Sequence, residues 1–299
     1  MPRQDGGGMA GVFFSRLRGK LNSLTRSNMR CLVINLDRSA ERLAHVTAQF
    51  ALIGVAFERV QAIDAQDRPE LDHLPQHVRY EKRLRLTSGE IACLLSHRAC
   101  WTIIAQGDAP FGAIFEDDIV FSSKASALIG NADWIPADAD IIKLETFFWN
   151  PLVGRKRIPA GAHFSLFRLY AEHVGTGGYI VSKRAARNLI DATREISVAV
   201  DDLVFNPIYQ PPPRKTVYQM VPALCIQDHL LGDKAFGLPS LLKQPRDAQW
   251  AAVEVVQKPR KTAAGRVKAE FARVVQRVAY FCLQRQKMAI PFDRPDAKD

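Results

Sequence analysis

The sequence has no charge-free apolar stretch of about 18 residues, so it predicts no membrane-spanning helix. Its five cysteines are widely spread and none forms a C-x-x-C pair, which gives no support for a disulfide framework or a zinc ribbon. This cysteine usage fits a reducing compartment best. Glycine (18 residues) and proline (17 residues) are near their average frequencies, which excludes collagen-like and low-complexity chains. The 299 residues, 47% hydrophobic and 24% charged, have the composition of a folded globular protein.

The net charge of +10 is unevenly distributed. Residues 1–28 carry +4 and residues 255–299 carry +7, which leaves −1 for residues 29–254. We therefore expect a flexible basic segment over 1–28, one folded domain over 29–254, and a basic amphipathic helix and tail over 255–299. A nucleic-acid enzyme usually has its positive charge around the site, so no nucleic-acid partner is expected. Basic ends on a neutral core fit attachment to an anionic membrane surface.

Apolar segments and helical patterns alternate at the start of the predicted domain. Residues 30–36 have the pattern of a buried strand, a helix follows and ends at Gly54, and residues 57–63 have the pattern of a second strand. This order predicts parallel pairing with a right-handed crossover. No G-x-G-x-x-G motif follows the first strand, so the dinucleotide-binding fingerprint is absent.

The next elements are marked by a capping box and by short apolar runs. Thr87 and Glu90 have the T-x-x-E spacing that starts a helix, which is expected to end near Gly107. Residues 146–170 give no clear signal. Further strands are expected at residues 111–115, 140–144, 179–182 and 217–226, with a helix at 183–192.

Three consecutive acids, Glu116, Asp117 and Asp118, directly follow the apolar run FGAIF. Side chains alternate along a strand, so Glu116 and Asp118 are expected to point the same way, with Asp117 opposite unless a turn recruits it. Two carboxylates on one side repel each other unless a hard divalent cation lies between them. Ligands of open α/β sheets bind beyond the carboxyl ends of the strands. The triplet therefore predicts Mg²⁺ or Mn²⁺ with a phosphate-bearing substrate, and a solvated acidic loop is the alternative.

Seven blocks, in order over about residues 30–230, resemble glycosyltransferase family 25, which includes lipopolysaccharide or lipooligosaccharide galactosyltransferase-like enzymes and the collagen galactosyltransferases. The blocks are VINLDRSAER (33–42), ERVQAIDA (58–65), LTSGEIACLLSHRACW (86–101), AIFEDDIVF (113–121), DIIKLE (140–145), GTGGYIVSKRAARNLI (175–190) and VDDL (200–203). The resemblance implies an α/β fold of the GT-A-like, nucleotide-sugar-binding type, with a mixed, mostly parallel central sheet flanked by helices. It also implies a UDP-sugar donor, typically UDP-galactose, and transfer with inversion at the anomeric carbon. Glu116–Asp118 stands where the family has a DxD-like metal site, with Glu in place of the first Asp.

The resemblance assigns metal binding to Glu116 and Asp118, and it places the donor near the ends of the first strands and the start of the capped helix. The residues expected to bind the donor are Asn35, Leu36, Asp37, Arg38, Asp64, Glu90, Ser96, His97, Asp117, Gly177 and Gly178. Capping of a helix or turn is the alternative for Asp37 and Asp64. For Glu90 the alternative is the capping box, and for His97 it is a structural role. Arg98 is a candidate cation for phosphate.

Inverting transfer needs a base that takes the proton of the acceptor hydroxyl. The candidates are Asp201, Asp202 and Glu145, with Asp201 preferred because it matches the family's Val-Asp step. Both aspartates can instead cap the helix that follows. His229 is a candidate third metal ligand, or a solvated loop histidine.

These inferences predict a cytoplasmic enzyme, peripheral on the inner face of the cytoplasmic membrane, that transfers a hexose to a cell-envelope saccharide or glycolipid. A nucleotidyltransferase is the alternative among enzymes, but it usually has a glycine-rich basic loop after the first strand, which NLDRSAER lacks. A basic membrane or nucleic-acid adaptor is the non-enzymatic alternative. It would explain the basic ends but not the acids.

Overall fold

The computed structural model describes residues 29–76, 85–171, 173–210, 214–232, 235–238, 275 and 278–292. Within these residues the main sheet has nine strands in the order β11-β6-β7-β9-β5-β8-β3-β1-β2. The strands are β1 (Arg30–Asn35), β2 (Glu58–Gln61), β3 (Phe111–Glu116), β5 (Ile141–Lys143), β6 (Leu152–Ala160), β7 (Phe164–Leu169), β8 (Gly178–Ser182), β9 (Val217–Val221) and β11 (Arg285–Lys287). A separate antiparallel pair consists of β4 (Ile119–Phe121) and β10 (Cys225–Gln227).

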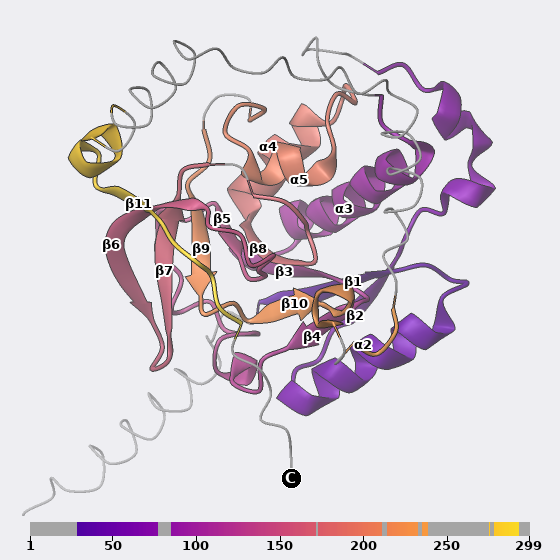
Figure 1. Ribbon diagram of the computed structural model, residues 1–299. Coiled ribbons are helices and arrows are strands. Elements are labelled where there is room, and N and C mark those ends of the chain that lie inside the picture. The colour runs from indigo at the N-terminus through magenta and orange to yellow at the C-terminus, as the bar shows by residue number, and fades with distance from the viewer. Residues whose placement is uncertain are drawn as a thin grey trace, which may run out of the picture.

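Helices cover both faces of the main sheet. They are α2 (Ala40–Ile53), α3 (Ser88–Gln106), α4 (Lys183–Ala192) and α5 (Val200–Phe205), with short 3₁₀ turns at Ala65–Asp67, Pro69–His73, Ala125–Ala127 and Asp228–Leu230. Figure 1 shows α3, α4 and α5 together on one side of the sheet, and α2 with the β4–β10 pair on the other. The chain is therefore of the α/β class, with the sheet as the middle one of three layers.

The predicted strand–helix–strand start is confirmed. β1 pairs in parallel with β2 on one side and with β3 on the other. Helix α2 ends at Gly54, whose φ of 65° lies in the left-handed region that glycine occupies without strain. The capping box of α3 is also confirmed, because Thr87 and Glu90 exchange both of its hydrogen bonds.

The expectation of a mostly parallel sheet is wrong. In the main sheet, the pairings β1–β2, β1–β3 and β5–β9 are parallel, and the other five pairings between described strands of that sheet are antiparallel. Strand β8 lies antiparallel between β3 and β5, and the β6–β7 hairpin extends the sheet through a turn at Gly161. A short connection between neighbouring strands reverses the chain, so hairpins give antiparallel pairs.

Two hydrophobic clusters hold the layers together. On the α2 face, Val46 and Phe50 pack with Phe115 and Phe121, and Phe50 meets both phenylalanines edge to face. On the α3 face, the larger side chains are those of Trp101, Tyr179 and Phe205, all at most 1% exposed. Both faces of the sheet are thus buried, and the strand ends at its rim are left to form a site.

The C-terminal region joins the sheet, which the sequence did not predict. β11 pairs with β6, Ile290 is buried, and Ala223 forms a β-bridge with Phe292. Much of the amphipathic helix and tail expected over 255–299 lies outside the described residues, as does the 1–28 segment. Where that helix is described, Val278 and Phe281 are exposed. In the part of the chain that the structure describes, no helix combines the length and apolar character needed to cross a bilayer.

Candidate active site

A cavity of about 650 Å³ opens beyond the carboxyl ends of β1 and β3, next to the start of α3. Cavities that bind small ligands measure about 300–1,000 Å³, so a nucleotide sugar fits this size class. The predicted residues that line the cavity are Asn35, Leu36, Arg38, Asp64, Glu90, Ser96, His97, Glu116, Asp117, Asp118, Asp201 and His229. The predicted residues that do not line it are Asp37, Arg98, Glu145, Gly177, Gly178 and Asp202.

The three acids lie at the end of β3 and do not continue the strand. β3 ends at Glu116, and Asp117 and Asp118 form a turn, so the strand alternation expected for Glu116 and Asp118 does not apply. All three carboxyl groups still line the same cavity. The turn brings Asp117 to the same cavity as Glu116 and Asp118, which was the alternative to the extended strand.

Arg42 on α2 is buried against the acid turn. Its Nε lies 2.8 Å from Asp117 Oδ1, and its Nη2 lies 2.6 Å from Asp118 Oδ2. Asn35 also holds Asp117, because its Nδ2 donates to Asp117 Oδ2 at 2.7 Å. One guanidinium therefore faces three carboxyl groups, and the site keeps an excess of negative charge.

Burial and mutual repulsion shift the pKa values of these acids in opposite directions. Burial, with the nearby charge of Glu116, raises the pKa of Asp118 to about 7. Burial also raises the pKa of Asp117. The pKa of Glu116 is lowered: burial alone would raise it, but hydrogen bonding and charge from His97 and a bond from Thr176 outweigh that effect. Of the three acids, Glu116 is thus the one whose ionised form is most favoured, and Asp118 is the one that keeps its proton up to about neutral pH.

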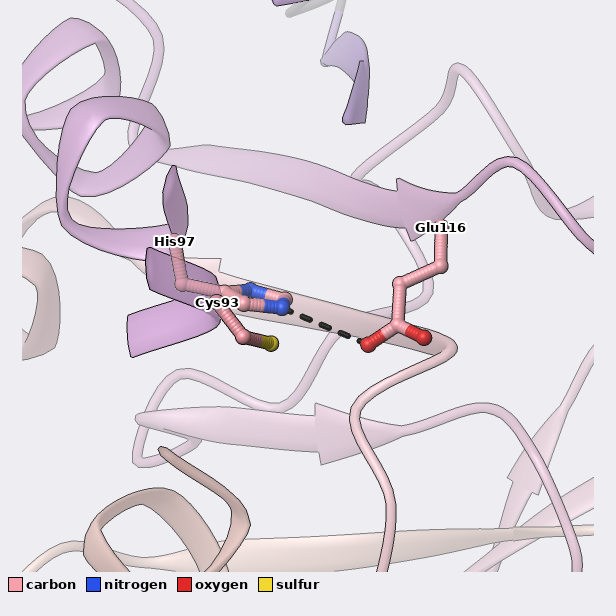
Figure 2. Close-up of side chains that lie close together, drawn as sticks. All are labelled: Cys93, His97 and Glu116. Carbon is pink, nitrogen blue, oxygen red and sulfur yellow. Dashed lines mark hydrogen bonds and ion pairs between the residues drawn. The ribbon is translucent and has the colours of Figure 1, made fainter. Parts of the chain in front are cut away.

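Glu116 is held by side chains from three other segments. Its Oε1 accepts from Thr176 Oγ1 at 2.7 Å, and its Oε2 accepts from Gln227 Nε2 at 2.9 Å. His97 Nε2 lies 3.4 Å from Oε1. Figure 2 shows His97 and Cys93 side by side on α3, both facing Glu116 at the end of β3.

The surroundings of His97 hold its ring in place. Trp101 Nε1 donates to Tyr179 Oη at 2.8 Å, and Tyr179 Oη lies 2.9 Å from His97 Nδ1. These contacts, with the one at Nε2, hold the imidazole ring so that Nε2 faces Glu116. Within the close group of Cys93, His97 and Glu116, the contact between His97 and Glu116 makes His97 a support for Glu116.

The residues present fit a divalent cation at the acid turn. Asp118 Oδ1 is buried and has no hydrogen-bond partner among the described residues. A buried carboxylate oxygen without a partner is costly, and a cation would satisfy it. Glu116 and Asp118 are the residues that would hold the ion, since each has oxygen lone pairs left after its bonds to Thr176, Gln227 and Arg42.

Several of the residues expected to bind the donor make hydrogen bonds or ion pairs within the protein. Asp64 caps a 3₁₀ turn by accepting from the Gln66 N–H, and it is paired with Arg38. Glu90 completes the capping box, and Ser96 Oγ accepts from the Ile63 N–H. Asp37 is exposed and pairs with Arg59 outside the cavity. The capping alternatives are thus observed for Asp64 and Glu90, which also line the cavity.

Of the three base candidates, only Asp201 lines the cavity. It lies in the first turn of α5, and its Oδ2 accepts from the Gly175 N–H at 3.2 Å. Asp202 accepts from Asn206 within the same helix region. Glu145 is fully buried, where Lys143 Nζ donates to its Oε1 at 2.7 Å, and this position gives it no route to an acceptor.

Gly177 and Gly178 serve packing. A Cβ on Gly177 would lie 2.6 Å from Glu145 Oε2, and one on Gly178 would lie 2.3 Å from Cys225 Sγ. Val174, Gly175 and Thr176, which directly precede them, are the loop residues that line the cavity. The glycines thus allow the loop to pack closely on Glu145 and β10.

Sequence reasoning missed several residues of the site, among them Arg42, Thr176, Gln227 and Trp149. Arg42 and Thr176 fall inside the blocks VINLDRSAER and GTGGYIVSKRAARNLI, so those blocks contained a signal for them. Gln227 and Trp149 lie outside the blocks, and only the fold brings them to the cavity.

Comparison with known proteins finds one family. Residues 28–204, more than half of the chain, match the profile of Glycosyltransferase family 25 (LPS biosynthesis protein). The lipooligosaccharide biosynthesis protein lic2B of Haemophilus influenzae is 28% identical over 224 residues, covering 72% of this chain and 82% of that protein. The lacto-N-neotetraose biosynthesis glycosyltransferases LgtE of Neisseria meningitidis and LgtB of Neisseria gonorrhoeae are 30% and 31% identical, each covering 66% of this chain and 73% of the relative.

Proposed function

The chain belongs to glycosyltransferase family 25 and is a glycosyltransferase. We propose that it transfers a hexose, with galactose as the preferred candidate, from a UDP-sugar to a cell-envelope glycan or lipid-linked saccharide. The observation that carries this proposal is the single cavity that joins the acid turn, Glu116 to Asp118, to Asp201. The names of the relatives, which refer to lipooligosaccharide and lacto-N-neotetraose biosynthesis, support an acceptor of the surface-glycolipid type.

The donor diphosphate is proposed to lie at the acid turn. Glu116 and Asp118 would hold Mn²⁺ or Mg²⁺ there, and the ion would supply neutralisation of the charge that builds on the leaving UDP. His97 and Thr176 favour the ionised form of Glu116, and Gln227 helps to orient its carboxylate. Arg42 keeps Asp117 and Asp118 in place without cancelling the full charge of the turn.

Asp201 is proposed as the base of an inverting transfer. Its carboxylate accepts from the N–H groups of Gly175 and Asp202, at 3.2 and 2.9 Å, and keeps lone pairs for the acceptor hydroxyl. In this role Asp201 removes the acceptor proton as the oxygen attacks the anomeric carbon. The bond to Gly175 also fixes the carboxylate relative to the loop that reaches Glu116.

The test is UDP release from a panel of UDP-sugars with Mn²⁺ and soluble saccharide acceptors, with and without EDTA. Asp201→Asn should lower kcat by about 10²-fold or more while UDP-sugar affinity stays near that of the wild type, because the base acts on the acceptor proton. Asp202→Asn is the matched control, since its neighbouring carboxyl group lies outside the cavity. Normal turnover of Asp201→Asn would refute the base, and full activity in EDTA would refute the metal.

Peripheral binding to an anionic membrane is proposed for the basic ends. Val278 and Phe281 are 57% and 62% exposed, and they lie in the +7 segment of residues 255–299. Apolar side chains next to Lys and Arg residues favour the bilayer interface, where each basic residue adds about 1 kcal/mol.

Point substitutions test this better than truncation, because residues 285–292 belong to the sheet. Val278→Ser with Phe281→Ser should reduce sedimentation with phosphatidylglycerol vesicles, and Ile208→Ser, at a residue 67% exposed elsewhere, should not. Vesicle binding that changes neither with the double substitution nor with the salt concentration would contradict the proposal.

A further inference from the structure

Three consecutive aromatic residues, Phe147, Phe148 and Trp149, form a bend beside the cavity. Phe148 has a φ of 57°, in the left-handed region that bulky residues rarely adopt. Phe148 is 49% exposed and Trp149 is 55% exposed. Large aromatic side chains usually bury most of their surface, so a bend that presents two of them to solvent needs an explanation.

The bend is held from beneath. Thr146 is fully buried, and its Oγ1 donates to the Ile290 carbonyl at 2.8 Å while accepting from the Phe148 N–H at 3.0 Å. The hydroxyl thereby stabilises the unusual backbone at Phe148 and connects it to the buried Ile290. The exposed aromatics are thus part of an ordered surface.

The bend lies at the Asp201 end of the site. The Phe147 ring covers Gly175 so closely that a Cβ on Gly175 would be 2.2 Å from it. The other side of Gly175 is tied to Asp201 through its N–H. Trp149 and Phe147 line the same cavity as Asp201, whereas Phe148 does not.

We propose that Trp149 is the stacking platform for a sugar ring of the saccharide acceptor, with Phe147 fixing the platform relative to Asp201. This inference rests on the proposed function and deepens it. A pyranose ring has one face formed mainly by C–H groups, and an aromatic ring offers that face a flat apolar surface while the hydroxyls stay hydrated. A sugar held there would have its hydroxyls close to the residue that must accept a proton.

The uracil ring of the donor is a second possible occupant of the Trp149 surface, because nucleobases also stack on aromatic side chains. The acceptor is favoured because Phe147 reaches Asp201 through Gly175, which precedes β8. The residues expected to bind the nucleotide, Asn35 and Asp64, follow β1 and β2, and β1 and β8 lie on opposite sides of β3 in the sheet. The two occupants give different results when the two ligands are titrated separately.

The test compares Trp149→Ala, Trp149→Phe and the control Phe148→Ala in the full chain. The first readout needs no turnover: saturation-transfer NMR with methyl β-glycosides of galactose, glucose and N-acetylglucosamine, and separately with UDP and Mn²⁺. We expect Trp149→Ala to weaken binding of the bound glycoside about tenfold or more, with Trp149→Phe near the wild type, because one aromatic face is kept. Phe148→Ala should bind the glycoside like the wild type, and UDP binding should not change in any variant.

The second readout is the KM for the same glycoside and for the UDP-sugar in the UDP-release assay. Unchanged glycoside affinity in Trp149→Ala, loss of UDP affinity instead, or no glycoside binding by the wild type would each overturn the platform. If turnover occurs and only the platform fails, the proposed function stands. If Trp149→Ala abolishes glycoside binding but no UDP-sugar is ever turned over, the platform stands and the proposed transfer fails.

Discussion

Arg42 shows how much one side chain decides at this site. It is 6% exposed and contacts two carboxyl groups of the acid turn. Arg42→Met keeps much of the packing but leaves these buried acids without their cation, which should lower the free energy of unfolding by about 3–5 kcal/mol. Urea unfolding measures this change.

The matched control is Arg38→Met, which breaks the Arg38–Asp64 pair. The Arg38 side chain is 45% exposed, so its loss should cost less than about 1 kcal/mol. Equal costs for the two variants would mean that the buried position of Arg42 adds nothing.

Asp118 makes stability depend on pH. Its carboxyl pKa is raised to about 7 in the folded protein, mainly by burial, against about 3.9 in an unfolded chain. Between these values the folded state holds a proton that the unfolded state has lost, so this contribution is complete below about pH 4 and disappears as the pH rises through about 7. The free energy of unfolding should therefore fall from pH 5 to pH 8 more steeply in the wild type than in Asp118→Asn.

Measured without metal, parallel curves for the two proteins would contradict this role of Asp118. Added Mn²⁺ provides a second check, because a cation that replaces the proton should stabilise the wild type more at pH 8 than at pH 5.5. Asp118→Asn should show little of this difference.

Among the elements, the loop before β8 depends on the absence of side chains at its glycines. Gly178→Ala would place a Cβ 2.3 Å from Cys225 Sγ, and overpacking of this kind costs about 1–3 kcal/mol. Cys225→Ala removes the obstructing sulfur. The double variant should therefore be less destabilised than the two single costs added together, as measured by urea unfolding; strict additivity would show that the contact does not limit the packing.

The elements that the sequence predicted are those whose signals are local. β1, α2 and the α3 capping box were found from apolar runs, a terminal glycine and T-x-x-E, and all three are confirmed. The β6–β7 hairpin was missed because β6 contains the exposed basic run 155–157 and a bulge, which break the strand pattern. The antiparallel position of β8 depends on pairings with β3 and β5 that no local pattern encodes.

The site follows the same division. The acid triplet is contiguous in the sequence, so its position at a strand end was predictable. Its partners, Arg42, His97, Thr176 and Gln227, come from four other segments, and their contacts depend on the tertiary fold. Asp201 was preferred to Glu145 from the sequence because it matches the family's Val-Asp step, and in the structure Asp201 lines the cavity whereas Glu145 is fully buried.

For the whole molecule, the segment 285–292 is part of the fold that supports the site. Ile290 is 1% exposed and its carbonyl holds Thr146. Ile290→Ala should lower the free energy of unfolding by about 2–5 kcal/mol. Leu283→Ala, at a side chain 55% exposed, should change it by less than about 0.5 kcal/mol. Similar values for both would show that this segment is only loosely attached.

The position of β11 also affects how the protein folds during its synthesis. A ribosome makes β6 long before β11, although the two strands are neighbours at one edge of the sheet. Until β11 emerges, β6 is an open edge, able to pair with another nascent chain. Arg155, Lys156 and Arg157 lie exposed in β6, and like charges on such an edge repel a second copy. The basic run that hid β6 from sequence analysis is thus suited to protect the unfinished sheet from aggregation.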